Sequence, residues 1–248
     1  MHFECASRTH VGLRRKINED SLFVDSEKGL WAVADGMGGH QAGEIASTMV
    51  TDALRCLPHI RDIEQRAAAA IEALQRVNRQ LIGLARADGD ARPSTIGTTV
   101  VGLAIANGSF CCFWMGDSRA YRLRGAEMTR VTRDHSLVQN LVDAGMLTPE
   151  EAETHENANL ITKAVGVGEN MEVDIVRGDT QPGDQFLLAS DGLTRVARDD
   201  EIAAELKRGP PEQAADRMID TVLARGAPDN VSLIIAKVLG AMPQPHPE

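Results

Sequence analysis

The strongest periodic pattern in the chain is a stripe of apolar residues between Ile63 and Ala87. Apolar side chains recur there at steps of three and four positions, at Ile63, Ala67, Ala70, Leu74, Val77, Leu81 and Leu84. This spacing places them on one face of a helix, so the pattern predicts a helix over Ile63–Ala87. Further helices are predicted over residues 41–57, 136–156 (with a break near Thr148 and Pro149), 201–208 and 211–225.

Short apolar runs predict strands. The runs Thr98–Ile105 and Phe110–Met115 are separated by Ala106-Asn107-Gly108-Ser109, and Asn-Gly between apolar runs is a strong hairpin signal. Strands are also predicted over Ser21–Val24, Leu30–Ala34, Tyr121–Leu123, Phe186–Ala189 and Val231–Val238. Strands and helices come in separate runs, which is typical of an α+β fold with antiparallel sheets.

The same pattern predicts how the chain is divided. We expect one domain over residues 1–240, since no linker or internal repeat interrupts it. The tail, residues 241–248, contains three prolines and is expected to be disordered. The stretch Asp88–Ser94 has the composition of a flexible loop.

Aspartates stand at the ends of five predicted strands, and they are Asp20, Asp35, Asp117, Asp191 and Asp229. Carboxylates gathered at one edge of a sheet would repel one another and lose hydration unless cations compensated them. Hard oxygen ligands suit magnesium, manganese or calcium. An aspartate at a strand end often merely begins a turn, but the recurrence at five ends favours a cation site.

Residues beside these aspartates add to the same hypothesis. Gly36 follows Asp35 in a glycine-rich stretch, where a backbone carbonyl could be a further ligand. Arg15 precedes Asp20 by five residues, and a guanidinium near a cation cluster suits bidentate binding of phosphate. By composition alone, Arg14 and Lys16 are equally suitable.

The net charge and the cysteine spacing exclude some classes of protein and of binding site. The formal net charge of −10 argues against a general nucleic-acid binder. The four cysteines include no CxxC pair and no zinc-type spacing, as expected of free thiols in a reducing compartment. The first ten residues have no apolar run, and no stretch approaches the roughly 18 apolar residues of a membrane span. We therefore expect a cytoplasmic protein with no membrane span.

Eight ordered motifs together resemble those of a known family. They are Arg15-Lys16-Ile17-Asn18-Glu19-Asp20, Asp35-Gly36-Met37-Gly38-Gly39-His40, Gly97-Thr98-Thr99, Gly116-Asp117-Ser118-Arg119, Thr132-Arg133-Asp134-His135-Ser136, Ile161-Thr162-Lys163-Ala164-Val165-Gly166, Ser190-Asp191-Gly192-Leu193 and Asp229-Asn230. The chain resembles the type 2C metal-dependent Ser/Thr protein phosphatases (PPM family) in their short bacterial form. The resemblance implies an αββα sandwich, with two antiparallel sheets flanked by pairs of antiparallel helices.

The resemblance also implies an activity and roles for single residues. The expected enzyme is a hydrolase of phosphoserine and phosphothreonine in proteins, acting in signal transduction opposite a bacterial Ser/Thr kinase. It would use two Mn²⁺ or Mg²⁺ ions that bridge a hydroxide. By motif position, the metal ligands are Asp20, Asp35, the Gly36 carbonyl, Asp191 and Asp229, with Asp117 at a weaker third site. Arg15 would bind the phosphate, Glu19 would hold metal-bound water, and residues 136–166 would form a flap beside the cleft.

Two positions depart from the family pattern. Met37 stands where many members have a histidine, so the proton donor for the leaving group is not assigned. Arg195 stands four positions after Asp191, where many members have an acidic residue. On a helical turn Arg195 would lie on the same face as Asp191 and would weaken a third cation site. The alternative is that Arg195 turns to solvent or pairs with Asp199 or Asp200.

Two other functions compete with this one. A phosphoprotein-binding regulator without catalytic activity would have lost metal ligands, whereas each implied position is filled here. A small-molecule phosphoesterase is the second alternative, but no GxxxxGK or GxGxxG loop indicates nucleotide recognition.

Overall fold

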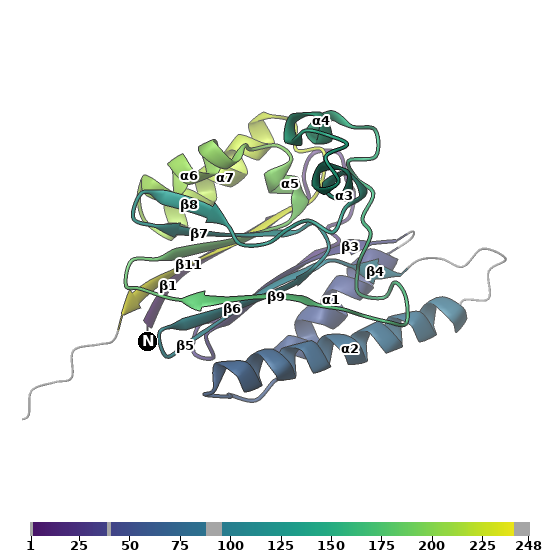
Figure 1. The fold of residues 1–248 in the computed structure, drawn as a ribbon, viewed down its shortest axis with the longest axis horizontal. Coiled ribbons are helices and arrows are strands. Elements are labelled where there is room, and N and C mark those ends of the chain that lie inside the picture. The colour runs from purple at the N-terminus through teal and green to yellow at the C-terminus, as the bar shows by residue number, and fades with distance from the viewer. Residues whose placement is uncertain (1, 39–40, 88–95, 241–248) are drawn as a thin grey trace, which may run out of the picture.

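The fold is that of a computed structural model, which describes residues 2–38, 41–87 and 96–240. The predicted loop at 88–94 and the predicted disordered tail at 241–248 lie outside these residues. Two antiparallel sheets are stacked face to face, with helices on both outer sides (Figure 1). The predicted α+β class and the sandwich of two antiparallel sheets are confirmed.

Each sheet joins strands that are distant in sequence. One has the order β1-β11-β10-β7-β8 and consists of β1 (His2–His10), β11 (Val231–Gly240), β10 (Gln185–Ala189), β7 (Arg119–Arg124) and β8 (Glu127–Arg130). The other has the order β2-β3-β5-β6-β9 and consists of β2 (Asp20–Asp25), β3 (Leu30–Met37), β5 (Val100–Ala106), β6 (Ser109–Met115) and β9 (Asp174–Asp179). The short strand β4 (Gly97–Thr98) pairs with β3.

Alternation along the strands builds three apolar layers. In β3, Trp31 and Val33 face the other sheet, whereas Leu30, Ala32 and Ala34 face the helices. The outer helices are α1 (Ala42–Arg55) and α2 (Ile63–Ala87) on the β3 side, and α6 (Asp199–Lys207) and α7 (Pro211–Ala224) on the β11 side. None of the described helices is long and apolar enough to cross a lipid bilayer.

The four cysteines are free thiols in the described structure. Cys111 and Cys112 are adjacent in β6 and are both buried, the first against the helices and the second between the sheets. Burial raises the pKa of both thiols, so neither is poised as a thiolate nucleophile.

Most predicted elements are present, with shifted ends. The Asn107-Gly108 hairpin joins β5 to β6, and both turn residues have positive φ, as a type I′ turn requires. The single strand predicted over Thr98–Ile105 is wrong, because it is divided at Thr99 into β4 and β5. The backbone N–H of Thr99 donates to the Asp35 carbonyl at 2.8 Å instead of continuing one ladder.

The flap region also differs from a simple broken helix. The predicted helical stretch 136–156 contains two short helices, α3 (Leu137–Asp143) and α4 (Pro149–Thr154). The predicted break near Thr148 is the start of α4, where the Thr148 hydroxyl accepts from the Glu151 N–H and the Glu151 carboxylate accepts from the Thr148 N–H. Strands β1, β8 and β9 were not predicted.

Candidate active site

Asp20 and Asp35 lie opposite each other on neighbouring strands. Asp20 begins β2 and is the cross-strand partner of Asp35 near the end of β3. Oδ2 of Asp20 accepts a hydrogen bond from the Ser190 hydroxyl at 2.9 Å, whereas Oδ1 is buried without a partner. Ser190 follows β10 of the other sheet, so this contact joins the two sheets at the site. Burial, with the nearby charges of Asp229 and Glu19, raises the pKa of Asp20 to about 6.

The backbone around Asp35 is fixed by β4 and α1. Its carbonyl accepts from the Thr99 N–H and from the Thr98 hydroxyl, at 2.8 and 2.9 Å. Next to it, Gly36 approaches α1 so closely that a Cβ there would lie 2.1 Å from the Gly43 carbonyl. Asp35 lines a cavity, yet desolvation and the charges of Asp191 and Asp20 raise its pKa well above the ordinary value.

Asp191 and Asp117 come from two other strand ends. Asp191 opens the four-residue helix α5 (Asp191–Thr194) directly after β10 and Ser190. Gly192 packs against Asn230, the residue before β11. A Cβ on Gly192 would lie 1.8 Å from the Asn230 carbonyl oxygen, so a larger residue would not fit. Asp117 follows β6 and is buried, with Oδ1 unpartnered. Burial and the charge of Asp117 raise the pKa of Asp191 to about 7.

Asp229 and Asn230 connect the start of β11 to the loop that carries Arg15 and Glu19. Asp229 Oδ2 accepts from Arg15 Nη2 at 2.8 Å. The buried Asn230 side chain accepts from the Glu19 N–H at 2.8 Å, and donates to the carbonyls of Val11 and Ile17 at 2.8 and 3.0 Å. Asn230 therefore holds the whole loop in place. Burial raises the pKa of Glu19.

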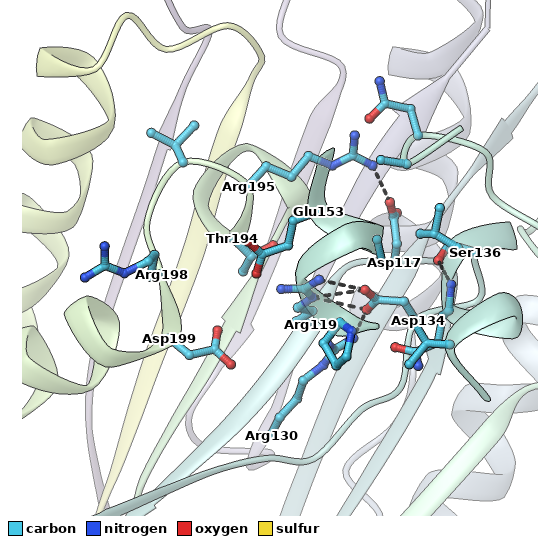
Figure 2. Close-up of a pocket in the computed structure, with 18 of the residues that line it drawn as sticks. Asp117, Arg119, Arg130, Asp134, Ser136, Glu153, Thr194, Arg195, Arg198 and Asp199 are labelled. Carbon is cyan, nitrogen blue, oxygen red and sulfur yellow. Dashed lines mark hydrogen bonds and ion pairs between the residues drawn. The ribbon is translucent and has the colours of Figure 1, made fainter. Parts of the chain in front are cut away.

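Of the six carboxylates described, all but that of Asp20 line one of two adjoining cavities. The first, of about 540 Å³, is lined by Arg15, Glu19, Asp35, Gly36, Asp191 and Asp229 on one side and by residues 159–164 on the other. The second, of about 590 Å³, lies between Asp117 and the flap helices α3 and α4 (Figure 2). Arg195 and Asn159 line both cavities.

The structure thus brings all the sequence-predicted residues to one edge of the sandwich. Their carboxylates are not closed into a cage, since among residues 2–38, 41–87 and 96–240 no three Asp, Glu, His or Cys side chains form a ready-made metal site. Hydrogen bonds and ion pairs from Ser190, Arg15 and Arg195 occupy four of the aspartates instead.

The donor set nevertheless fits divalent cations. The buried Oδ1 of Asp20, one of the ligands that the sequence implies, has no hydrogen-bond donor. Desolvation, together with the charges of neighbouring carboxylates, raises the pKa of Asp20, Asp35 and Asp191, so a cation bound there would favour their ionised forms. All the side chains are hard oxygen ligands of the kind that Mg²⁺ and Mn²⁺ bind.

Sequence reasoning overlooked three supporting side chains: Ser190, Asn230 and Asn78. Ser190 and Asn230 lie within motifs and Asn78 lies on the predicted helix Ile63–Ala87, but none was given a role. Asn78, buried in α2, accepts from the Gly166 N–H at 2.6 Å and donates to the Gly168 carbonyl at 3.0 Å. A buried amide on the apolar face of a predicted helix was the available signal for Asn78.

Known proteins give an independent comparison. The profile of the family described as protein phosphatase 2C matches residues 9–239. The Ser/Thr protein phosphatase PstP of Mycobacterium tuberculosis is 37% identical over 236 residues, which are 94% of this chain and 45% of PstP. The chain thus spans less than half the length of this relative. A Streptococcus pyogenes protein named as a 2C-type phosphatase is 35% identical over 92% of this chain and 94% of its own length.

Solved structures agree with these sequence matches. PppA, described as a key regulatory component of the type VI secretion system (T6SS) in Pseudomonas aeruginosa, has a TM-score of 0.88 and 38% identity, covering 96% of this chain and 98% of PppA. The catalytic domain of PstP, solved in complex with two manganese ions, has a TM-score of 0.84 and 35% identity, covering 96% of this chain and 99% of that domain. The chain therefore belongs to the protein phosphatase 2C family.

Proposed function

We propose that this chain is a metal-dependent protein Ser/Thr phosphatase that hydrolyses phosphoserine and phosphothreonine in proteins. The observation that carries the proposal is the convergence of five aspartates, from strands of both sheets, at one edge of the sandwich, where Asp35, Asp191 and Asp229 share a cavity with Arg15. Family membership adds that several similar proteins are named Ser/Thr phosphatases.

Two divalent ions are the proposed cofactors. Asp20, Asp35, the Gly36 carbonyl, Asp191 and Asp229 would hold them, and the two manganese ions of the PstP domain support this number. When bound, such ions supply a water of lowered pKa and neutralise charge on phosphoryl oxygens. Manganese and magnesium both suit oxygen ligands, and we favour manganese from the PstP domain.

The residues of this chain position the substrate. Arg15 is half exposed at the cavity and touches only one oxygen of Asp229, so its guanidinium can turn to a phosphate. Glu19 is held at the cavity by Asn230, with its carboxylate close to Gly43, and it would accept a proton from water there. Met37 lines the same cavity and has no proton to give the leaving group.

Partners and location follow by analogy. Phosphorylated proteins are the proposed substrates, and a Ser/Thr kinase of the same cell is the proposed opposing enzyme. The four free thiols suit a reducing compartment, which supports a cytoplasmic location. The alternatives, a non-catalytic phosphoprotein binder and a small-molecule phosphoesterase, are less favoured because the similar proteins are named as protein phosphatases.

Phosphate release from a phosphothreonine peptide tests the proposal. The protein should lose activity in chelator and regain it with Mn²⁺ or Mg²⁺. Asp35→Asn removes one carboxylate with little change of shape, and it should lower turnover by about 10³-fold or more, because the site would lose a ligand. Full activity in metal-stripped protein, or an unimpaired Asp35→Asn variant, would contradict the mechanism. Faster hydrolysis of small phosphate esters than of every phosphopeptide tried would favour the small-molecule alternative.

A further inference from the structure

Arg195 lies one helical turn after Asp191, and both its backbone and its side chain contact Asp191. The Arg195 N–H donates to the Asp191 carbonyl at 2.9 Å, which closes the turn of α5. Because residues four apart share a helix face, the Arg195 side chain lies beside the Asp191 carboxylate, with Nε 2.9 Å from Oδ2. The turn itself therefore determines where this guanidinium lies.

The same guanidinium also binds Asp117. Nη2 of Arg195 donates to Asp117 Oδ2 at 2.8 Å, a contact drawn in Figure 2. One positive charge thus connects two carboxylates that come from different sheets. The sequence alternative, in which Arg195 turns to solvent or pairs with Asp199 or Asp200, is wrong.

Asp199 and Asp200 have other partners. Asp199 accepts from the Tyr121 hydroxyl at 2.8 Å, and Asp200 pairs with Arg198 at 3.0 Å. The Arg198–Asp200 pair is solvent-exposed, whereas the side chain of Asp117 is only 6% exposed and that of Asp191 17%. Buried carboxylates depend on a compensating charge far more than exposed ones do. Arg195 therefore neutralises two largely buried carboxylates, whereas Arg198 pairs with one that is exposed to solvent.

The net charge of the ionised groups at the site is equal and opposite to the charge of two divalent ions. Six carboxylates meet there, those of Asp20, Asp35, Asp117, Asp191, Asp229 and Glu19, along with two guanidinium groups, those of Arg15 and Arg195. Four negative charges remain when all are ionised. Two divalent cations neutralise them, whereas a third would leave the site with excess positive charge.

We propose that Arg195 is a built-in cation that takes the place of a third divalent ion between Asp117 and Asp191. A guanidinium keeps its charge at all physiological pH values, and here it occupies one oxygen of each carboxylate. The chain then binds two divalent ions, and Asp117 serves to hold Arg195 rather than a metal. The inference rests on the proposed two-ion function and specifies its stoichiometry.

Mn²⁺ binding to the metal-stripped full chain tests this stoichiometry by calorimetry and equilibrium dialysis. The parent protein should bind two equivalents. Arg195→Asp should bind a third, at least about tenfold more tightly than any third binding in the parent, because the variant exchanges a positive charge for an oxygen ligand. Arg198→Met is the matched control, since Arg198 lines the same second cavity but pairs only with an exposed carboxylate. It should bind two equivalents, as the parent does.

A second readout does not depend on loaded enzyme. In chelator, Arg195→Met should unfold at a lower temperature than the parent, because Asp117 and Asp191 lose their shared counter-charge. Saturating Mn²⁺ should remove most of this difference, and Arg198→Met should unfold in chelator like the parent.

The outcomes separate this inference from the proposed function. A parent protein that binds a third equivalent as tightly as Arg195→Asp does would overturn the role of Arg195 and leave the phosphatase proposal standing. An Arg195→Met variant as stable as the parent in chelator would do the same. A parent protein that binds no Mn²⁺ at all would overturn both.

Discussion

Arg15 is the one residue of a basic triplet that the structure brings to the cavity. Composition alone could not choose among Arg14, Arg15 and Lys16, because all three are short-range neighbours of Asp20. In the structure Arg15 lines the cavity and contacts Asp229 at 2.8 Å, whereas Arg14 and Lys16 are exposed and do not line it. The choice depends on the path of the loop, which Asn230 fixes from 213 residues away in sequence through its contact with Ile17.

Replacing Arg15 should therefore affect substrate binding more than chemistry. We expect Arg15→Ala to raise KM for a phosphothreonine peptide by about 10-fold or more and to lower kcat by a smaller factor, since a charged hydrogen-bond donor to the phosphate is lost. Steady-state kinetics on one peptide measures both constants. Arg14→Ala is the matched control and should leave both nearly unchanged. An equal effect of the two substitutions would contradict the assignment.

Site residues were predictable where a local pattern accompanied them, and not otherwise. The five aspartates could be located because each follows or precedes an apolar run. Ser190 and Asn230 could not be given roles, because their partners Asp20 and Glu19 lie 170 and 211 residues away. Only the closed sandwich brings these pairs together.

Among the elements, periodicity decided what the sequence could predict. The helix predicted over Ile63–Ala87 matches α2 at both ends, because its apolar stripe continues along its whole length. Strands β1 and β9 lie at sheet edges, and only Ala6 is fully buried in β1. An edge strand buries little on either face, so polar residues hide its alternation.

Asn78 connects α2 to the end of the flap, and its removal should loosen that end. Its side-chain amide contacts the backbone of Gly166 and Gly168, both with positive φ. Asn78→Ala leaves a partly buried N–H and a carbonyl without their side-chain partners, and should lower the free energy of unfolding by about 1 kcal/mol or more. Urea denaturation measures this change, and faster hydrogen exchange at residues 164–168 would localise it.

Gln80→Ala provides a control on the same helix, since Gln80 is exposed. This variant should unfold at nearly the parent's urea concentration. Asn78→Ala with unchanged stability, or with faster exchange spread evenly over the molecule, would show that Asn78 does not hold the flap end.

At the scale of the whole molecule, both sheets contribute carboxylates to the site. Asp20 and Asp35 come from one sheet, and Asp191 and Asp229 lie at strand ends of the other. Folding therefore forces these carboxylates together, and desolvation raises the pKa of Asp35, and those of Asp20 and Asp191 to about 6 and about 7. In the unfolded chain the same groups ionise near pH 4. The metal-free fold thus holds protons that the unfolded chain has released.

This difference predicts an unusual dependence of stability on pH in chelator. A group whose pKa is raised by folding contributes stability below its unfolded pKa and loses it as pH rises through its folded pKa. We expect the metal-free protein to lose on the order of 2–4 kcal/mol of unfolding free energy between pH 5 and pH 7.5. His135, whose pKa burial lowers, acts in the opposite direction but is a single group. Surface carboxylates such as Glu201, with its pKa lowered to about 2 by Arg225, stay ionised throughout this range.

Denaturant titrations at the two pH values, with chelator and with Mn²⁺, measure the effect. Bound divalent ions favour the ionised carboxylates, so Mn²⁺ should abolish or reverse the loss at pH 7.5. Asp191→Asn removes the carboxylate whose pKa is raised to about 7, and should flatten the pH dependence in chelator. A metal-free parent that is equally stable at both pH values, or more stable at pH 7.5, would mean that folding neither desolvates these carboxylates nor makes them repel one another. The electrostatic reason for inferring a metal centre at this edge of the sandwich would then be lost.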